Sequence, residues 1–275
     1  MSKWRPARAC TYVIPDIHGR YDCLRAICKR ILPLRKDDRL ILLGDYIDRG
    51  PDSAKVIEYL IELKSKYKDN IIPLLGNHEW FVLASLKEVS YIQNPLELSP
   101  FAMWMQNGGA QTVLSYAAQR GLKIDNTFVI SQNRVRDFIP QSHIDFMLNE
   151  TYLMYETENY IFVHAGCDPN KAANPADSDV YLWDRSLYHT AKKLVKAGKK
   201  LPWEKTIVLG HSSDGPWIND KLMMLDCLTL KKLLVVELNS REAFMASPGN
   251  TRLERIDLDS YKPIPAKSIF RRVDG

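Results

Sequence analysis

Polar side chains able to bind metal ions follow five short apolar runs of this 275-residue sequence. Each run is followed within two residues by a carboxylate, an amide or an imidazole. Because the carboxyl ends of strands in an open α/β sheet meet at one edge, these groups can converge on one site. Carboxylate and imidazole ligands together suit Mn, Fe or Zn better than Ca²⁺. The runs and their polar residues are 12–14 with Asp16 and His18, 40–43 with Asp45, 71–75 with Asn77 and His78, 160–163 with His164, and 207–209 with His211.

A pair of cations sharing one carboxylate would suit the hydrolysis of a phosphoester. Asp16 and His18 are two residues apart, so in an extended segment both side chains point to the same face. Two ions bridged by one carboxylate lie roughly 3.5–4 Å apart, lower the pKa of a shared water and neutralise a phosphoryl group during in-line displacement. The residue types therefore predict phosphoester hydrolysis at a two-metal site.

Two arginines and a His–Asp pair complete the predicted chemistry. Arg49 and Arg185 can hold phosphate oxygens through charge-assisted, often bidentate contacts. His78 can protonate a leaving alcohol if a carboxylate orients its ring, and Asp48 is the candidate carboxylate. The structural alternatives are a simple turn ion pair for Asp48 and Arg49, and a surface position for Arg185.

The elements that must position these side chains alternate between strand and helix. The five apolar runs are short and rich in Ile, Val and Leu, which predicts buried strands. Amphipathic spacing predicts helices at 21–32 and 53–66, the second with Ser53 as its N-cap. This order indicates an α/β fold, and the region 81–148 is predicted to be helical. Further strands are predicted at 222–225 and 233–238.

The composition excludes several classes of protein. Thirty-eight Lys and Arg against 33 Asp and Glu give a net charge of +5, which is small for a dedicated nucleic-acid binder, so no specific nucleic-acid binding is expected. The five Cys are odd in number and form no CxxC pair, which argues against a disulfide framework or a thiolate zinc site. Without a signal-peptide-like stretch or an apolar segment of roughly 18–20 residues, we expect a cytoplasmic protein with no membrane role.

Five motifs occur in order at the ends of these runs and together resemble one family. The sequence resembles the calcineurin-like metallophosphoesterases, and within them the phosphoprotein phosphatases, especially the compact bacterial and phage-type serine/threonine protein phosphatases. Asn107-Gly108-Gly109 and Trp183-Asp184-Arg185 share in this resemblance, which spans about residues 12–211. One motif alone would be a weak signal, whereas five in order are a strong one. The motifs are Pro15–Gly19, Gly44–Gly50, Gly76–Glu79, His164–Gly166 and Gly210–His211.

The resemblance implies an α/β fold of the αββα-sandwich type, with the active site at the C-terminal ends of the strands. We expect a single domain over residues 1–275, with a core at about 10–240 and a C-terminal tail at about 248–275. The resemblance also implies two divalent metal ions, with Mn²⁺ expected and Fe or Zn as alternatives. It implies direct attack on phosphorus by a hydroxide that bridges the two ions.

The resemblance assigns roles to particular residues. His78 matches the general acid, and Asp48 matches its orienting partner. Arg49 and Arg185 match phosphate-binding arginines, and Asn77 is expected to contact the substrate as well. The predicted metal ligands are Asp16 and His18 for the first ion, Asp45 as the bridging carboxylate, and Asn77, His164 and His211 for the second ion.

Some segments depart from the family pattern. Pro15 replaces the usual glycine before the first aspartate, which fixes φ and removes a donor. His211 is followed by Ser212-Ser213, and Asp226 by Cys227 where the family has a glycine-rich segment. The far rim of the site, and hence the choice of substrate, is therefore less predictable than the metal core.

Other features keep two interpretations each. Asn107–Gly109 can be a helix end with a turn, or a segment with a role near the site. The lysines of 192–200 can form a solvated helix face, or steer an anionic substrate. Met103–Met105 is predicted to be core, and His143 and His189 to be structural or surface residues.

Three hypotheses for the function follow. The leading one is a metal-dependent phosphomonoesterase acting on phosphoserine or phosphothreonine in phosphoproteins, because symmetrical diadenosine tetraphosphatases of the family usually differ at Asp48 and carry Asp in place of Glu79. The alternative is hydrolysis of a dinucleoside polyphosphate, a nucleotide or an RNA-end phosphate. A non-catalytic phosphate-binding scaffold is the third, and the presence of every expected ligand and of His78 argues against it.

Overall fold

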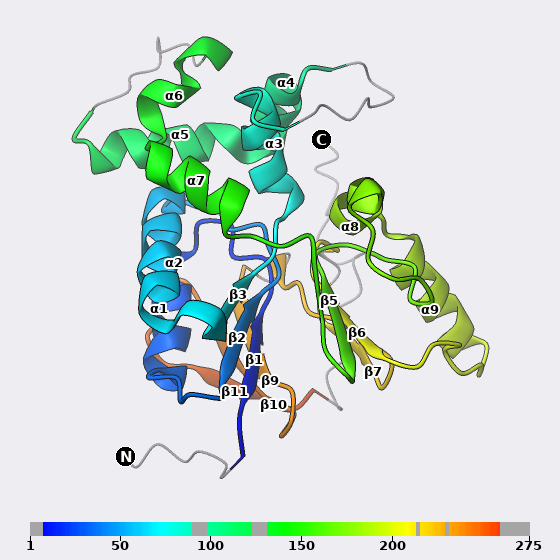
Figure 1. Ribbon diagram of the computed structural model, residues 1–275. Coiled ribbons are helices and arrows are strands. Elements are labelled where there is room, and N and C mark those ends of the chain that lie inside the picture. Colours follow the sequence, from blue (N-terminus) through cyan, green and yellow to red (C-terminus); the bar gives the residue numbers. More distant parts are fainter. Residues whose placement is uncertain (1–7, 90–97, 123–130, 213–214, 229–230, 259–275) are drawn as a thin grey trace, which may run out of the picture.

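The computed structural model describes residues 8–89, 98–122, 131–212, 215–228 and 231–258. Two β-sheets face each other, and helices cover their outer sides (Figure 1). One sheet has the strand order β11-β10-β9-β1-β2-β3 and the other β4-β5-β6-β8-β7. The predicted α/β sandwich is therefore confirmed. The strands are β1 (Thr11–Ile14), β2 (Arg39–Leu42), β3 (Ile71–Pro73), β4 (Met154–Glu156), β5 (Tyr160–Val163), β6 (Thr206–Leu209), β7 (Trp217–Asn219), β8 (Leu222–Met224), β9 (Leu233–Glu237), β10 (Glu242–Ala246) and β11 (Glu254–Ile256).

The helices form two groups around the sheets. One group covers the six-stranded sheet and extends beyond its edge at the top of Figure 1, and the other covers the five-stranded sheet. The described residues of the region 81–148 form helices joined by short turns and contain no strand, in agreement with the predicted helical region. The helices are α1 (Tyr21–Ile31), α2 (Ser53–Tyr67), α3 (Asn77–Ser85), α4 (Pro100–Trp104), the π-helical turn η2 (Met105–Gly109), α5 (Ala110–Gln119), α6 (Val135–Phe138), α7 (Gln141–Asn149), α8 (Ser178–Trp183) and α9 (Ser186–Lys196).

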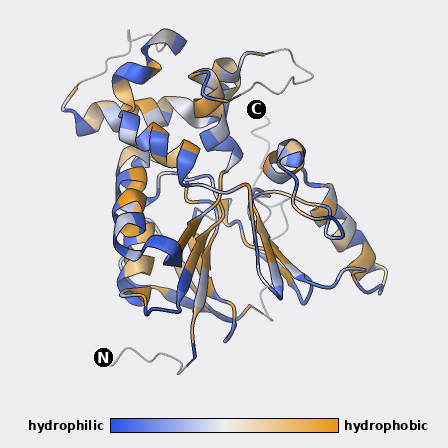
Figure 2. Ribbon diagram, in the orientation of Figure 1, coloured by the Kyte–Doolittle hydropathy of each residue, from blue (hydrophilic) through white to orange (hydrophobic). Residues whose placement is uncertain are grey.

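Side chains of the strands alternate between two cores. In β1, Val13 packs into the layer between the sheets, against residues such as Phe162 and Val208 of the second sheet. Its neighbour Ile14 faces the other way, into the core formed with α1 and α2. Alternate side chains of a strand enter different cores, so both faces of the strand are buried. The strands are therefore apolar along most of their length (Figure 2). A third core lies between β5, β6 and the helices α8 and α9.

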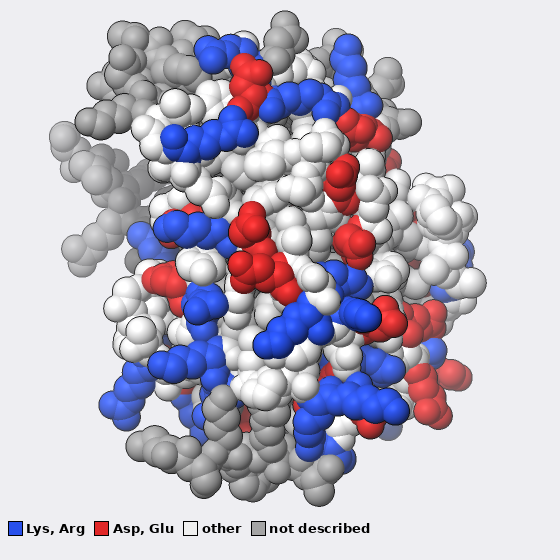
Figure 3. All heavy atoms as spheres, turned by 60° about the vertical axis from the view of Figure 1, so that its left-hand side comes forward, with Lys and Arg blue, Asp and Glu red and all other residues white. Residues whose placement is uncertain are grey.

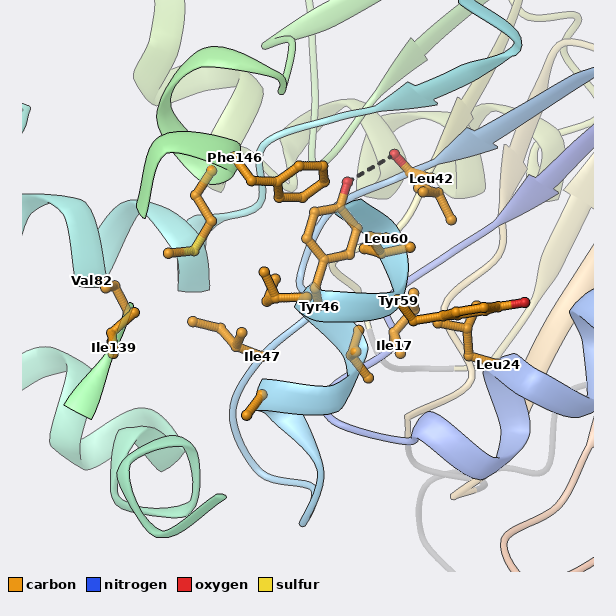
Figure 4. Close-up of a cluster of buried hydrophobic side chains, with 14 of the residues drawn as sticks. Ile17, Leu24, Leu42, Tyr46, Ile47, Tyr59, Leu60, Val82, Ile139 and Phe146 are labelled. Carbon is orange, nitrogen blue, oxygen red and sulfur yellow. Dashed lines mark hydrogen bonds between the residues drawn. The ribbon is translucent and has the colours of Figure 1, made fainter. Parts of the chain in front are cut away.

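The loop after β2 is anchored by a buried tyrosine. Tyr46 is fully buried among apolar side chains of α1, α2 and α7 (Figure 4). Its hydroxyl donates to the Leu74 carbonyl at 2.5 Å and lies 3.4 Å from the Leu42 carbonyl. A hydrogen-bonded hydroxyl avoids the penalty of burying a polar group. Tyr46 thus ties the ends of β2 and β3 together beside the polar residues that follow them.

The surface of the helical side carries charges of both signs. Acidic and basic side chains are interspersed over the face that Figure 3 brings forward. On the other side, Lys193 and Lys196 of α9 are exposed while Leu187, Tyr188 and Ala191 pack inward. The lysine run therefore includes a solvated helix face. Among the residues that the structure describes, no helix is long and apolar enough to cross a membrane.

The structure corrects two boundaries. The sheet does not stop near residue 240, because β10 and β11 pair antiparallel after β9 and extend it to Ile256. The predicted tail therefore begins later, and residues 259–275 lie outside the described part of the chain. Ser53 is not an N-cap: it is the first residue of α2, and its hydroxyl accepts the N–H of Asp48 at 3.0 Å instead.

Two histidines and the cysteines were predicted to have no part in the site. His143 is buried between the Tyr116 hydroxyl at 2.8 Å and a Glu58 carboxylate oxygen at 2.9 Å, so it is structural. His189 is exposed on α9. All five cysteines are buried and unpaired, as expected for a chain without a disulfide framework.

Candidate active site

The predicted ligands converge where the two sheets meet. Strands β1, β2 and β3 run parallel, as do β5 and β6, so the segments that follow them emerge at the same edges. The Asp16 carboxylate after β1 accepts the backbone N–H of His211 after β6 at 3.0 and 3.1 Å. This contact joins the two sheets, and it places both ends of the predicted ligand set side by side.

Asp45 lies at the centre of the site. The Nε2 atoms of His18 and His78 lie 3.5 and 3.8 Å from its Oδ2, and that of His164 lies 3.4 Å from its Oδ1. Two compact groups of potential ligands share this carboxylate, one with His18 and His78 and the other with His164 and His211. All of these side chains are buried. A carboxylate common to two groups is the arrangement needed to bridge two cations.

The histidines present fixed ring nitrogens toward Asp45. His18 Nδ1 lies 2.8 Å from the Ile47 carbonyl, and His164 Nδ1 lies 2.7 Å from the Leu43 carbonyl. Because a carbonyl can only accept, each Nδ1 carries the proton and each Nε2 keeps a lone pair for a metal. The orientation of both rings is therefore set by backbone atoms of the loop after β2.

Asn77 supplies an amide oxygen between two histidines. It is the first residue of α3, and its Oδ1 lies 3.0 Å from His164 Nε2 and 3.0 Å from His211 Nδ1. These three side chains follow β3, β5 and β6. The structure thus brings together all three residues predicted for the second metal ion.

The carboxylates of the site repel one another. Burial raises the pKa of Asp16 well above its usual value, and the charges of Asp226 and Asp45 raise it further. Burial likewise raises the pKa of Asp226 to about 6. Burial also opposes ionisation of Asp45, but the four surrounding histidines outweigh it and hold its pKa well below the usual value. Divalent cations would relieve this crowding of negative charge.

His211 is a buried imidazole with one ring nitrogen unpartnered in the described part of the chain. Burial, together with the nearby His164, lowers its pKa to about 2, so the imidazole is uncharged near neutral pH. Its Nε2 is buried without a hydrogen-bond partner among the described residues. An unsatisfied buried nitrogen is costly unless another group binds it. Together with the oxygen and nitrogen donors around Asp45, this atom fits a site for divalent cations.

His78 and Asp48 form a close pair next to Asp45. His78 Nδ1 lies 2.6 Å from Asp48 Oδ2, and both side chains are buried. Burial opposes protonation of His78, but the charges of Asp45 and Asp48 outweigh it and raise its pKa. A ring held through Nδ1, with a raised pKa, is suited to donate a proton from Nε2. The predicted orienting contact is present.

One arginine lies beside each group of ligands. Arg49 NH1 donates to His18 Nε2 at 3.1 Å, and Arg185 NH2 lies 3.5 Å from the His211 carbonyl. Both arginines are exposed, and each contacts a buried histidine of the site. They are therefore placed to receive an anion from solvent, although the Arg185 contact is long.

The loop geometry of the site differs from the extended one that the sequence suggested. The φ angle is positive at five site residues, at a typical cost of about 1–2 kcal/mol each. His18 is one of them, so Asp16 and His18 reach the site through a turn rather than from one face of a strand. The five are His18 at 45°, Asp45 at 52°, Asp48 at 71°, Arg49 at 65° and His211 at 62°.

Glu79 holds the loop after β2 in this conformation. Its carboxylate accepts the backbone N–H groups of Asp45 and Tyr46 at 2.8 Å, of Gly76 at 3.1 Å and of Ile47 at 3.2 Å. Four donors on one buried carboxylate fix the path of the chain. Sequence reasoning gave Glu79 no such role, although it stands beside His78 in one of the motifs.

Asn107–Gly109 lies near the site. Gly108 has a φ of 106°, and its carbonyl accepts the Arg49 N–H at 3.4 Å. A Cβ at Gly108 would lie 2.9 Å from Arg49 Cγ, so only glycine permits this approach. Of the two interpretations of the segment, the one with a place beside the site is therefore favoured. The rim residues 213–214 and 229–230 lie outside the described part of the chain.

The layered fold and the clustered Asp, Asn and His side chains define a two-sheet α/β sandwich with a candidate two-metal site. A family model described as calcineurin-like phosphoesterase matches residues 11–224, and the chain belongs to this family. The solved structure of a predicted diadenosine tetraphosphatase aligns with 90% of this chain and 97% of its own, at a TM-score of 0.53 and 17% identity. A cold-active protein tyrosine phosphatase mutant aligns at a TM-score of 0.50 and 15% identity, over 94% of this chain and 83% of its own. At these identities the likeness concerns the fold alone.

Curated relatives carry different names. A zinc-dependent endopolyphosphatase of Saccharomyces cerevisiae is 34% identical over 38% of this chain and 28% of its own length. A symmetrical bis(5'-nucleosyl)-tetraphosphatase of Wigglesworthia glossinidia brevipalpis is 31% identical over 48% of this chain and 49% of its own. A predicted serine/threonine-protein phosphatase of Caenorhabditis elegans is 41% identical over 26% and 20%. The chain spans half or less of the length of these relatives, whose names point to different substrates.

Proposed function

We propose that the protein is a metal-dependent phosphomonoesterase acting on phosphoserine or phosphothreonine in phosphoproteins. The observation that carries the proposal is the 2.6 Å contact between His78 Nδ1 and Asp48 Oδ2, next to the shared carboxylate of Asp45. Alkoxide leaving groups such as serine need a proton in the transition state, and this pair is suited to supply one. The fragment relationship to a predicted serine/threonine-protein phosphatase agrees with this choice.

The metal ions would be held by the side chains that surround Asp45. We assign Asp16 and His18 to the first ion, Asp45 to both, and Asn77, His164 and His211 to the second. When bound, two divalent cations supply an activated water and neutralise charge on the phosphoryl group. Mn²⁺ is the first cation to test, with Fe and Zn as alternatives; a zinc-dependent relative supports including Zn.

The remaining residues of the site position the substrate and move a proton. Arg49 and Arg185 bind the phosphoryl oxygens with their guanidinium groups, and Asn77 lies between the metal-binding histidines where its amide can contact the same group. His78 donates its Nε2 proton to the leaving oxygen, and Asp48 stabilises the imidazolium through Nδ1. The five unpaired buried cysteines support the proposal that the protein works in the reducing cytoplasm.

A second candidate is hydrolysis of a dinucleoside polyphosphate, a nucleotide or an RNA-end phosphate. It is favoured by the fragments shared with symmetrical bis(5'-nucleosyl)-tetraphosphatases, which are 42% identical over 74 residues in Buchnera aphidicola. The metal core serves both reactions, so the rim of the site decides between them.

A substrate panel tests the proposal. The protein, stripped with a chelator and reloaded with Mn²⁺, Zn²⁺ or Fe²⁺, is assayed on a phosphoserine peptide, para-nitrophenyl phosphate, diadenosine tetraphosphate and inorganic polyphosphate. We expect metal-restored turnover with the highest kcat/KM on the phosphopeptide. Efficient turnover of the dinucleotide alone would support the second candidate instead. No metal-restored activity on any phosphoester would remove the proposal of an enzyme.

A further inference from the structure

The Asp48 carboxylate is bound by two side chains that the proposed mechanism does not use. The Trp104 indole N–H donates to both of its oxygens, at 2.9 Å to Oδ1 and 3.0 Å to Oδ2. The Thr112 hydroxyl donates to Oδ1 at 2.5 Å. His78 Nδ1 approaches Oδ2 from the remaining side at 2.6 Å. Each of these four side chains is at most 1% exposed, so protein groups alone surround the carboxylate.

Thr112 also holds the backbone of Asp48. The Asp48 N–H is shared between the Thr112 hydroxyl at 2.9 Å and the Ser53 hydroxyl at 3.0 Å. The two hydroxyls lie 3.0 Å apart. Because Asp48 has a φ of 71°, its backbone needs such contacts to stay in the left-handed region. Thr112 therefore fixes both the main chain and the side chain of Asp48.

The turn between α4 and α5 brings the two donors together. Trp104 ends α4, Thr112 lies in the first turn of α5, and the π-helical turn Met105–Gly109 separates them. A Cβ at Gly109 would lie 2.7 Å from the Trp104 ring, so the glycine allows the ring to pack there. The same turn presents the Gly108 carbonyl to the Arg49 N–H. One short segment thus contacts both Asp48 and its neighbour Arg49.

We infer that Trp104 and Thr112 are positioning residues that fix the Asp48 carboxylate, and through it the His78 ring, for proton donation to the leaving group; this rests on the proposed phosphomonoesterase function. With Trp104 and Thr112 bound to Asp48, Oδ2 stays directed at His78 Nδ1. His78 Nε2 then faces the centre of the site, 3.8 Å from Asp45. Without either donor, the buried carboxylate has an unmet hydrogen bond and turns toward other donors.

Two variants remove the donors with little change of shape. Trp104→Phe keeps an aromatic ring but lacks the N–H, and Thr112→Val keeps the branched shape but lacks the hydroxyl. Thr112→Ser restores the hydroxyl and is the rescue. Matched controls lie elsewhere: Trp203→Phe removes a buried indole N–H that donates to the Lys221 carbonyl at 2.8 Å, and Ser115→Ala removes a buried hydroxyl of α5 that accepts the Ala54 N–H at 3.0 Å.

Kinetics with two leaving groups separate positioning from a structural role. On a phosphoserine peptide, whose leaving alkoxide needs a proton, we expect each donor variant to lose kcat on the order of 10-fold with little change of KM. On para-nitrophenyl phosphate, whose leaving group needs little protonation, we expect much smaller losses. Thr112→Ser should recover most of the rate, and the two control variants should behave as wild type. Equal losses on both substrates would overturn the inference.

A spectroscopic readout does not depend on activity. A short buried N–H to a carboxylate gives a strongly downfield proton resonance, and we expect one for His78 Nδ1, assigned by its loss in Asp48→Asn. It should shift or broaden in Trp104→Phe and Thr112→Val and stay unchanged in Trp203→Phe. An unchanged resonance in both donor variants would overturn the inference. If the wild-type protein shows this resonance but hydrolyses no phosphoester with any cation, the proposed function fails while the hydrogen-bond arrangement stands.

Discussion

The two sides of Asp45 satisfy their polar groups in different ways. On one side, His78 and Asp48 are bonded to protein groups, with Trp104 and Thr112 enclosing the carboxylate. On the other, His211 Nε2 is buried without a partner among the described residues, and Asp16 is crowded by other carboxylates. Protein groups therefore satisfy the His78–Asp48 pair, whereas cations would supply what His211 Nε2 and the crowded carboxylates lack. Substitutions and cation removal should consequently affect the two sides differently.

The largest effect is expected from the residue common to both sides. Asp45→Asn removes the shared carboxylate charge while keeping a residue that tolerates the positive φ of 52°. We expect the loss of bound metal and of nearly all turnover, measured by metal analysis and phosphatase assay. The exposed Asp37→Asn serves as the control. Normal metal content together with a normal rate would contradict the bridging role.

The next effect isolates the proton-donor side. His78→Asn should keep both metal ions, because all the assigned ligands of both ions remain, but lose about 10²–10⁴ in kcat on a phosphoserine peptide. The loss on para-nitrophenyl phosphate should be smaller. Metal analysis of the same sample checks that the cation side is intact. A variant that lost its metal, or lost both substrates equally, would place His78 among the ligands.

Cations should stabilise the folded protein through the ligands around Asp45. They relieve the repulsion that raises the pKa of Asp16 and Asp226. At 100 times the dissociation constant, Mn²⁺ bound only to the folded state adds about 2.7 kcal/mol to the free energy of unfolding, or roughly 5–10 °C in Tm. Thermal unfolding with and without Mn²⁺ measures this. Asp45→Asn should lose the response, and an equal shift in that variant would point to cation binding elsewhere.

The smallest effect compares the two arginines. Arg185→Lys should raise KM by about 10-fold, or about 1.4 kcal/mol, because a lysine cannot make the bidentate contact, and Arg49→Lys should act similarly on the opposite side. Bound metal should be unchanged in both. Steady-state kinetics on the phosphopeptide provide the measurement, with the exposed Arg252→Lys as the control. A normal KM for Arg185→Lys would show that Arg185 does not bind the phosphoryl group.

The strand ends and the polar residues that converge there were predictable because five apolar runs are each followed by a possible ligand, and the ends of parallel strands meet at one edge. The loop conformations were not, since His18 and Asp45 occupy backbone angles that residue spacing does not encode. Trp104 looked like a core residue, which it is, but its indole N–H also serves Asp48. Trp104 and Thr112 are eight positions apart, about two turns of a regular α-helix, and the irregular turn Met105–Gly109 lets both reach Asp48. In the sequence, Gly108 and Gly109 were the sign of this turn.

The contact between Asp16 and His211 has a consequence for the order of folding. The two residues are 195 positions apart, and their hydrogen bond closes the site between the sheets. A chain in synthesis has no complete ligand set until the sixth strand has been made and has joined its sheet. Long-range contacts of this kind form late, because the loop they close must be ordered first. Cation uptake would therefore follow folding rather than nucleate it, and bound metal would serve as a marker of chains that have reached the native topology.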